Sequence, residues 1–211
     1  MKNELLPTRF EGIEENVYAG FWVRVAARLL DFVILLPIAG LVLYVNNISK
    51  SAYMNMLLPN LLFALAFEVI LVKVYGGTPG KLIMGLKIIR KDGDSVDWKT
   101  SFFRYSVQFT LGILSAYVLF LTLSLIDDNA YNSAGFLQKS QLLSKANPGP
   151  MQIPNILSLA WYIAGTIVLL SNSRKRTTHD FIAGTVVVKA AYLDKIREAA
   201  NDAETEEPTA V

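Results

Sequence analysis

The stretch at residues 21–40, FWVRVAARLLDFVILLPIAG, combines an apolar run of membrane-spanning length with charged side chains near its start. About 20 mostly apolar residues cross the hydrocarbon core of a bilayer. Arg24, Arg28 and Asp31 nevertheless lie at the beginning of this run. A charge at the centre of a span costs at least ~2.5–3.5 kcal/mol on insertion scales, and less near the interface. Such residues are therefore either paired structurally or used functionally.

The composition extends the membrane prediction to the whole chain. Of its 211 residues 53% are hydrophobic and 18% are charged, and none is cysteine. Four apolar runs predict membrane-spanning helices at about residues 25–45, 55–74, 105–126 and 153–171. We therefore expect a mainly α polytopic membrane protein with four transmembrane helices.

The distribution of basic residues predicts the orientation of these spans. The termini and the loop between the second and third spans hold seventeen Lys and Arg residues, and the other two loops hold three. This bias places both termini and the middle loop in the cytoplasm of a cell-membrane protein. It divides the chain into a cytoplasmic surface arm at 1–19, a membrane domain at 20–190 and a cytoplasmic tail at 191–211. The net charge of +2 favours membrane lipid over nucleic acid as a partner.

The middle loop and the segment after the last span carry strand patterns. Residues 86–91 partly alternate and are followed by Asp92-Gly93, a strong hairpin signal. Residues 184–189 form a short β-branched run. We expect these pieces to pair in a small cytoplasmic β-sheet, whereas residues 127–152 should be irregular and extracytoplasmic. We find no internal repeat.

The three charges of the first span lie at positions i, i+4 and i+7, and therefore on one helix face. Arg28 can pair with Asp31 within the helix. Arg24 lies about 10 Å from Asp31 along the axis and needs another partner. Asp180 is the natural candidate, because its segment returns to the same membrane face. These residues form either a structural charge clamp between the sheet and the first helix or an ion or proton site.

Glu68 and Lys81 extend the set of candidate residues. If Glu68 faces Arg24 or Arg28 it belongs to a clamp. If it faces a wet cavity beside Asp31, the two carboxylates can share a proton or a cation. Lys81 follows Pro79-Gly80, which suits a type II turn, and we expect its ammonium group to lie among lipid phosphates.

The remaining residues give no sign of an enzyme or a cofactor. His179 is the only histidine, so multi-histidine metal sites are excluded. No arrangement of nucleophile, base and orienting group is recognisable. We therefore expect neither a catalytic site nor a metal or other cofactor.

Three separated blocks of this sequence resemble the RDD family of small integral membrane proteins, named for one arginine and two aspartates. The blocks are Ala19–Asp31 (AGFWVRVAARLLD), Gly77–Ile88 (GTPGKLIMGLKI) and Arg176–Val187 (RTTHDFIAGTVV). The resemblance implies that Arg24 is the family arginine and that Asp31 and Asp180 are its aspartates. Arg28 is then an accessory charge, and Arg104 is similar to an arginine common at the start of the family's following span. Some family members are associated with sodium/proton exchange.

Two functions follow from these observations. The first is a monovalent cation/proton antiporter in which Asp31 and Asp180 bind H⁺ or Na⁺ competitively, Arg24 tunes them and Glu68 joins them. Four spans without a repeat leave little room for alternating access, so this function predicts a homo-oligomer. The alternative is a non-transporting membrane adaptor or scaffold in which Arg24, Asp31 and Asp180 form a structural charge clamp.

Overall fold

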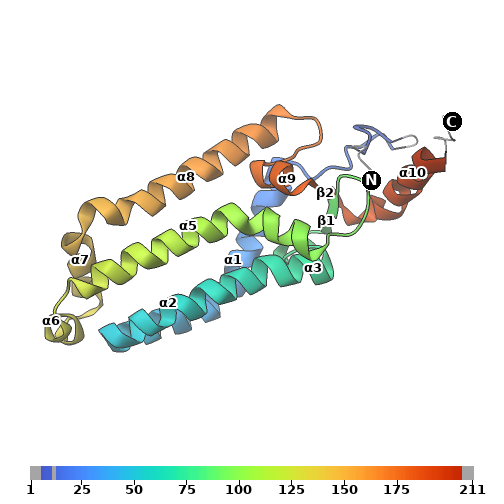
Figure 1. Ribbon diagram of the computed structural model, residues 1–211. Coiled ribbons are helices and arrows are strands. Elements are labelled where there is room, and N and C mark those ends of the chain that lie inside the picture. The colour runs from blue at the N-terminus through green and yellow to red at the C-terminus, as the bar shows by residue number, and fades with distance from the viewer. Residues whose placement is uncertain (1–5, 11–12, 206–211) are drawn as a thin grey trace. The chain divides into compact units, whose positions relative to one another are not determined.

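The computed structural model describes residues 6–10 and 13–205, with side chains as far as residue 199, and the chain is mainly helical (Figure 1). In this part of the chain four helical segments are long and apolar enough to cross a membrane. They are α1 (Phe21–Ile48), the segment Lys50–Ile83, α5 (Trp98–Ser124) and α8 (Pro148–Ser171). The prediction of four membrane-spanning helices is thus confirmed. Each begins before its predicted start, whereas α5 ends at Ser124, before the predicted bound at 126, and α8 ends at the predicted residue 171.

The second spanning segment consists of several helices. It starts as α2 (Lys50–Leu65), passes through the π-helical turn η1 (Ala66–Ile70) and continues as α3 (Leu71–Tyr75). Gly76 ends α3 in the left-handed conformation, with φ of 77°. A second short helix, α4 (Pro79–Ile83), then begins. The predicted type II turn is therefore wrong: Pro79 occupies the first helical position, where its fixed φ suits a helix and its missing N–H costs nothing.

The predicted sheet is present as two antiparallel strands, β1 (Leu86–Arg90) and β2 (Thr185–Lys189). Their register places Ile88 opposite Val187 at the centre of the pair. Gly93 turns the chain with φ of 90°, but the return side of the predicted hairpin is a single bridge between Ile89 and Ser95. The strand that stabilises β1 is consequently the distant β2.

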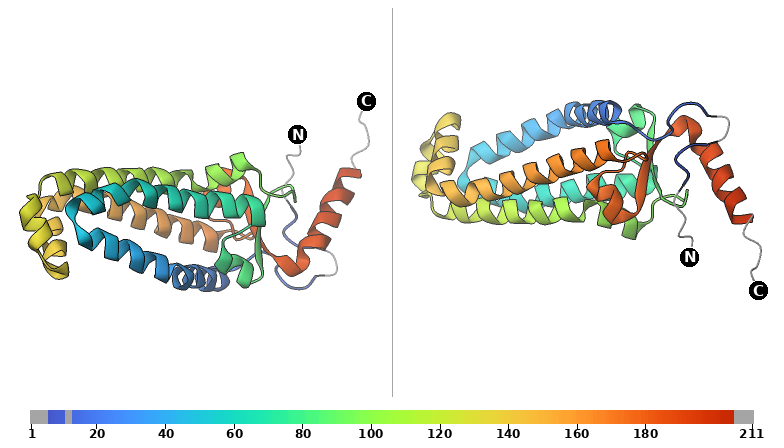
Figure 2. Two further views of the ribbon diagram at one scale, coloured as in Figure 1. Left: turned by 90° about the horizontal axis from the view of Figure 1, so that it is seen from below. Right: turned by 90° about the horizontal axis from the view of Figure 1, so that it is seen from above.

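The chain forms two compact units, which are described in turn. The first unit contains residues up to 33, 67–105 and 164 onward, and it includes the sheet, the helix α9 (Thr178–Ala183) and the ends of the spanning helices. After β2 the chain continues through η2 (Ala190–Tyr192) into α10 (Leu193–Thr205), shown in red in Figure 2. Thus the predicted C-terminal tail is helical as far as Thr205, and residues 206–211 lie outside the described residues.

The sheet carries apolar side chains on both faces, so each strand is buried on both sides. One face packs on a cluster that includes the N-terminal arm and α10, and the other on a cluster that includes α1 and α3. The first cluster is formed by Leu6, Phe10, Val17, Tyr18, Ile89, Val186, Val188 and Ile196. The second is formed by Ala19, Ala27, Val72, Leu86, Ile88, Val96 and Val187.

The N-terminal arm is part of this core and does not lie free on the surface. The Ala19 amide donates to the Val187 carbonyl at 2.9 Å, and the Lys189 amide donates to the Val17 carbonyl at 2.9 Å. Tyr18 forms the bridge to Val188 between these two bonds. The described arm residues therefore cover the free edge of β2, and the expectation of a surface arm is wrong for its apolar residues.

The second unit contains residues 34–66 and 106–163, and its connecting segment is helical. Helices α6 (Asp128–Ser133) and α7 (Phe136–Ala146) replace the irregular loop that the sequence predicts. Two lysines bind carbonyl oxygens at the ends of long helices: Lys139 donates to Asn47 at 2.6 Å and Lys50 donates to Ile126 at 2.8 Å. Cations are favourable there, because helix C-termini carry partial negative charge.

Candidate functional site: a charge network beside the sheet

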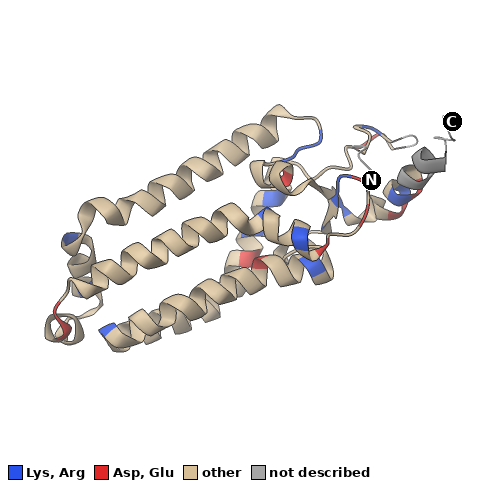
Figure 3. Cartoon of the chain, viewed as in Figure 1, with Lys and Arg blue, Asp and Glu red and all other residues tan. Residues whose placement is uncertain are grey.

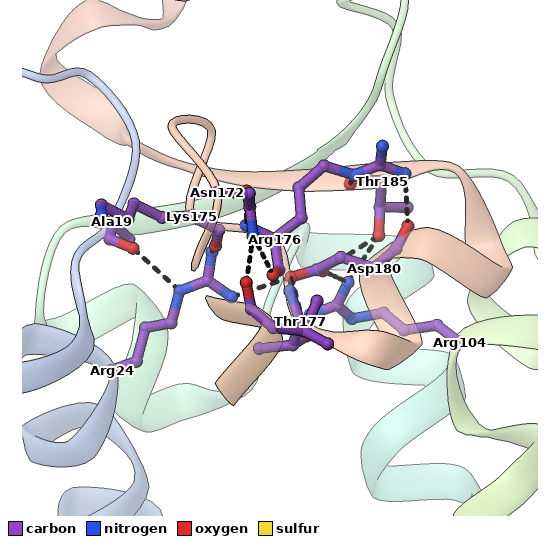
Figure 4. Close-up of polar contacts among 10 residues, drawn as sticks. Ala19, Arg24, Arg104, Asn172, Lys175, Arg176, Thr177, Asp180 and Thr185 are labelled. Carbon is purple, nitrogen blue, oxygen red and sulfur yellow. Dashed lines mark hydrogen bonds and ion pairs between the residues drawn. The ribbon is translucent and has the colours of Figure 1, made fainter. Parts of the chain in front are cut away.

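The centre of the site is the carboxylate of Asp180, which is fully buried in the first unit (Figure 4). Its Oδ2 accepts hydrogen bonds from the Thr177 amide at 2.9 Å, the Thr177 hydroxyl at 2.8 Å and Arg24 Nη1 at 3.0 Å. Its Oδ1 accepts from Arg104 Nη1 and, at 3.2 Å, from the Thr185 hydroxyl. Five donors from four residues therefore surround one carboxylate.

Arg24 connects α1 to two segments that are distant in sequence. Besides Asp180, it binds the Lys175 carbonyl through Nη2 at 2.6 Å and the Ala19 carbonyl through Nε at 3.0 Å. Lys175 is the one described non-glycine residue with positive φ, at 50°. This backbone conformation is costly for a residue with a side chain, and here its carbonyl binds a buried guanidinium. The predicted pairing of Arg24 with Asp180 is present.

Two further arginines bind the segment that carries Asp180. Arg104, at the start of α5, binds the Thr185 hydroxyl at 2.5 Å in addition to the carboxylate. Arg176 donates to the Thr185 carbonyl at 3.0 Å and to the Asp180 carbonyl at 2.9 Å. Its guanidinium also stacks on the Phe181 ring, with 4.0 Å between the guanidinium carbon and the ring centroid. The start of β2 is therefore bound from α5 and from the preceding loop.

The surroundings lower the pKa of both titratable groups of this segment, which keeps the acid charged and the imidazole neutral. Burial alone would raise the pKa of the Asp180 carboxyl, but Arg104 and Arg24 hold that pKa well below its usual value. Burial lowers the pKa of the neighbouring His179 imidazole to about 3, and Arg104 contributes in the same direction. Asp180 is therefore a carboxylate and His179 a neutral imidazole at physiological pH.

Asp31 forms a second site, with α4 as its partner. Its Oδ2 accepts from the Thr78 hydroxyl at 2.6 Å, and its Oδ1 accepts from the Gly80 amide at 2.7 Å. Thr78 and Gly80 flank the first residue of α4, so the carboxylate of α1 binds donors at the start of this helix. Lys81 donates to the same Thr78 hydroxyl at 3.1 Å. Lys81, predicted among lipid phosphates, thus lies within this network.

Glu68 faces Arg28 in the first unit. Arg28 Nη1 lies 2.6 Å from Glu68 Oε1, and the side chains are 54% and 20% exposed. Glu68 lies in the π-helical turn η1, and such turns occur frequently at functional sites. Of the two orientations that the sequence left open, the structure places Glu68 against an arginine. Figure 3 shows several acidic and basic segments close together in the first unit.

The two networks are built on two segments of the same backbone form, although no internal repeat is evident in the sequence. Thr78 and Thr177 cap helices of five and six residues, Gly85 and Gly184 follow with φ of 64° in both, and a five-residue strand comes next. The amides of both glycines bind the carbonyl three residues back, in Leu82 and in Phe181. These helix–glycine–strand segments, Thr78–Arg90 and Thr177–Lys189, pair symmetrically about Ile88 and Val187.

The repeated segments carry opposite charges at their matched position. Lys81 and Asp180 both lie three residues after the capping threonine, and each binds that threonine's hydroxyl. Asp180 is surrounded by arginines of α1 and α5. Lys81 instead shares its threonine with an acid of α1, Asp31. One segment thus contributes a base and the other an acid to their contacts with the spanning helices.

Several residues of the networks were missed or underestimated from sequence. The role of the threonines was the hardest to predict from sequence. Thr177 and Asp180 nevertheless have the spacing of a capping box, and Thr78 precedes a proline that starts a helix. No spacing rule points to Thr185 or to the carbonyl of Lys175. In the described part of the chain, no group of three or more His, Cys, Asp or Glu side chains is arranged to hold a metal ion.

Four apolar spanning helices and a charge network at their ends define a polytopic membrane protein. The sequence model of the RDD family matches residues 18–184, and the chain belongs to this family. The match contains the whole first repeated segment, Thr78–Arg90, and the second one as far as Gly184, together with the residues Arg24, Asp31, Arg104 and Asp180.

Two proteins of Bacillus subtilis (strain 168) are similar to parts of this chain. The uncharacterized protein YckC is 33% identical over 114 residues, which cover 49% of this chain and 74% of YckC. The uncharacterized membrane protein YteJ is 32% identical over 98 residues, which cover 42% of this chain and 60% of YteJ. The second similarity supports the membrane assignment.

Proposed function

We propose that this RDD protein is a membrane scaffold in which Arg24, Asp31 and Asp180 fix the sheet to the spanning helices. The observation that carries this proposal is the saturation of Asp180. A carboxylate offers about four lone-pair sites, and Asp180 accepts from Arg24, Arg104, Thr177 and Thr185, from Thr177 twice. A cation or an exchangeable proton would have to displace a donor that the protein itself supplies.

Asp31 supports the same proposal. Both of its oxygen atoms accept short hydrogen bonds from α4, and its backbone is packed against Gly80. These bonds join α1 to the segment that leads into β1, as the bonds of Asp180 join α1 and α5 to the segment that leads into β2. These bonds hold the sheet, the N-terminal arm and α10 in one fixed arrangement. The surface of this arrangement is available to a protein partner. By the positive-inside rule we place this surface, with both termini, in the cytoplasm.

The experiment compares folding with transport in the same variants. Asp31→Asn and Asp180→Asn are reconstituted in proteoliposomes with matched incorporation, beside the wild type and Asp194→Asn, whose side chain is exposed on α10. We expect both buried-site variants to melt at lower temperature than Asp194→Asn, and the wild type to move no protons in response to Na⁺, K⁺ or Li⁺. The scaffold function would be contradicted if the wild type showed cation-driven proton movement and Asp180→Asn abolished it without changing the melting temperature.

A monovalent cation/proton exchange function is the second candidate, and Glu68 favours it. Its carboxylate is more exposed than those of Asp31 and Asp180 and lies in a π-helical turn. If the protein exchanges ions, we propose that Glu68 is the titrating acid and Arg28 its counter-ion. Glu68→Gln should then abolish cation-driven proton movement with little loss of stability, while Asp180→Asn should lose both together. This outcome would favour the exchange function over the scaffold function.

A further inference from the structure

The short helices α4 and α9 each present apolar side chains that the first unit covers only in part, including Phe181, whose ring stacks on Arg176. Ile83 is 64% exposed, Phe181 is 50% exposed and Ile182 is 48% exposed. Ile83 and Ile182 occupy the same position in the two repeated segments, five residues after the capping threonine. The exposure of an apolar residue at this position therefore occurs twice in the structure.

The opposite side of each short helix is bound to a spanning helix. Gly80 of α4 contacts the backbone of α1, and its amide binds Asp31. Asp180 of α9 binds Arg24 of α1 and Arg104 of α5. Each helix thus has a polar side bound within the protein and an apolar side that faces outward.

Aromatic residues mark the level of the membrane interface at this end of the spans. Trp22 lies at the start of α1, Trp98 at the start of α5 and Tyr75 at the end of α3, and all three are exposed. Tryptophan and tyrosine are enriched at the boundary between headgroups and acyl chains. Helix α4 begins shortly after Tyr75, and α9 begins shortly after α8 ends at Ser171. Both short helices therefore start where the chain passes the interface.

We propose that α4 and α9 are a matched pair of interfacial helices that bind the headgroup–acyl boundary of a phospholipid leaflet. Ile83 from α4 and Phe181 and Ile182 from α9 enter the acyl region. Lys175 and Arg174, whose Nε also donates to the Leu6 carbonyl at 2.7 Å, precede α9 and supply positive charge beside the lipid phosphates. The partner is lipid and not protein because the apolar sides lie on two short helices beside the ends of membrane spans, flanked by basic residues, as interfacial helices require.

The absence of cysteine makes a direct test simple. Single cysteines replace Ile83, Ile182, Leu41 or Lys195 and carry a nitroxide label in nanodiscs of phosphatidylcholine and phosphatidylglycerol. Leu41 is an exposed apolar residue within α1, and Lys195 is an exposed charged residue of α10. Collisions with oxygen report contact with acyl chains, and collisions with a water-soluble nickel chelate report contact with water.

We expect the labels at 83 and 182 to collide several-fold more with oxygen than with the nickel chelate, as at position 41. The label at 195 should show the reverse preference. A nickel preference at 83 and 182 would place the two helices in water and overturn the proposal. Low collision rates with both reagents would also overturn it, because protein would then cover the apolar sides. A difference in preference between 83 and 182 would contradict the matched pair.

Discussion

The Gly80 amide donates to Asp31 Oδ1 at 2.7 Å, and this contact requires that residue 80 have no side chain. A Cβ atom on Gly80 would lie 2.8 Å from the Asp31 amide nitrogen and 2.9 Å from its carboxyl carbon, and nearer still to the Ala27 carbonyl oxygen. Real Cβ atoms essentially never approach other atoms so closely. The acid of α1 therefore binds α4 only where a glycine lets the two backbones meet.

Replacing Gly80 by alanine should separate α4 from α1. Overpacking typically costs about 1–3 kcal/mol, and here the clash is with backbone atoms that cannot rotate away, so we expect the upper end of that range. Thermal unfolding in detergent measures the loss. Gly40→Ala is the matched control, because nothing lies within 4 Å of a Cβ there and α1 should gain stability. Equal melting temperatures for the two variants would show that the close approach does not matter.

Neutralising Asp180 should destabilise the protein strongly. Asp180→Asn leaves two buried guanidinium groups, those of Arg24 and Arg104, without their counter-ion, and breaking a buried pair costs about 3–5 kcal/mol. Denaturant unfolding measures this change. In the double variant Asp180→Asn/Arg104→Gln, the second substitution should cost less than it does in the wild type. Additive losses would mean that the two residues are not coupled.

Lowering the pH should weaken the network through Asp180 and His179. The pKa of Asp180 is lowered in the folded state, so its contribution is present above the unfolded value of about 3.9 and is lost as the pH falls through the folded value. The pKa of His179 is lowered to about 3, so stability also falls between about pH 6.5 and pH 3, as the unfolded imidazole takes up its proton first.

His179 is the only histidine, so its ring can be followed without assignment problems. ¹⁵N NMR of the imidazole should show a neutral ring at pH 5, where an exposed histidine is protonated. The unfolding free energy of His179→Gln should depend less on pH between 6.5 and 4 than that of the wild type. A ring that titrates near pH 6.5 in the folded protein would contradict the burial argument.

Relieving the backbone at Lys175 should stabilise the protein. Its φ of 50° lies in the left-handed region, which costs a residue with a Cβ atom about 1–2 kcal/mol and costs glycine little. Lys175→Gly should therefore raise the melting temperature, offset in part by the entropy of the unfolded chain. Lys175→Ala removes the same charge but keeps the strain, and should show no rise. A rise in both variants would point to charge and not to the backbone.

The sequence was sufficient for the spans, the sheet and the pairing of Arg24 with Asp180. Apolar length and charge placement are properties that a membrane imposes directly on sequence, and a buried arginine beside a span must find an acid. The hydroxyl donors were less predictable, because threonines such as Thr185 are common and their partners depend on tertiary packing. The arm was misjudged because its apolar residues are scattered among acids, and only the presence of the sheet gives Leu6 and Phe10 a surface to cover.

The helices α6 and α7 were missed for a related reason. The motif Asn147-Pro148-Gly149-Pro150 favours the irregular loop predicted for residues 127–152, but in the structure Pro148 is the first residue of α8. The orientation of Glu68 could not be predicted, because the π-helical turn changes which side of the segment it occupies. The internal repeat remained hidden because few residue types are shared; what the two segments share is the spacing of threonine, glycine and strand.

That repeat gives the chain the form of two hairpins of membrane helices, each followed by the same short segment. A protein with a single hairpin could close the sheet only with a second copy of itself, and two identical copies would carry the same charge at the matched position. Within one chain the two segments differ in sequence, so this constraint does not apply, and the matched position is Lys81 in one segment and Asp180 in the other. A single chain can therefore carry opposite charges at the matched position of its two segments, whereas a symmetric dimer cannot.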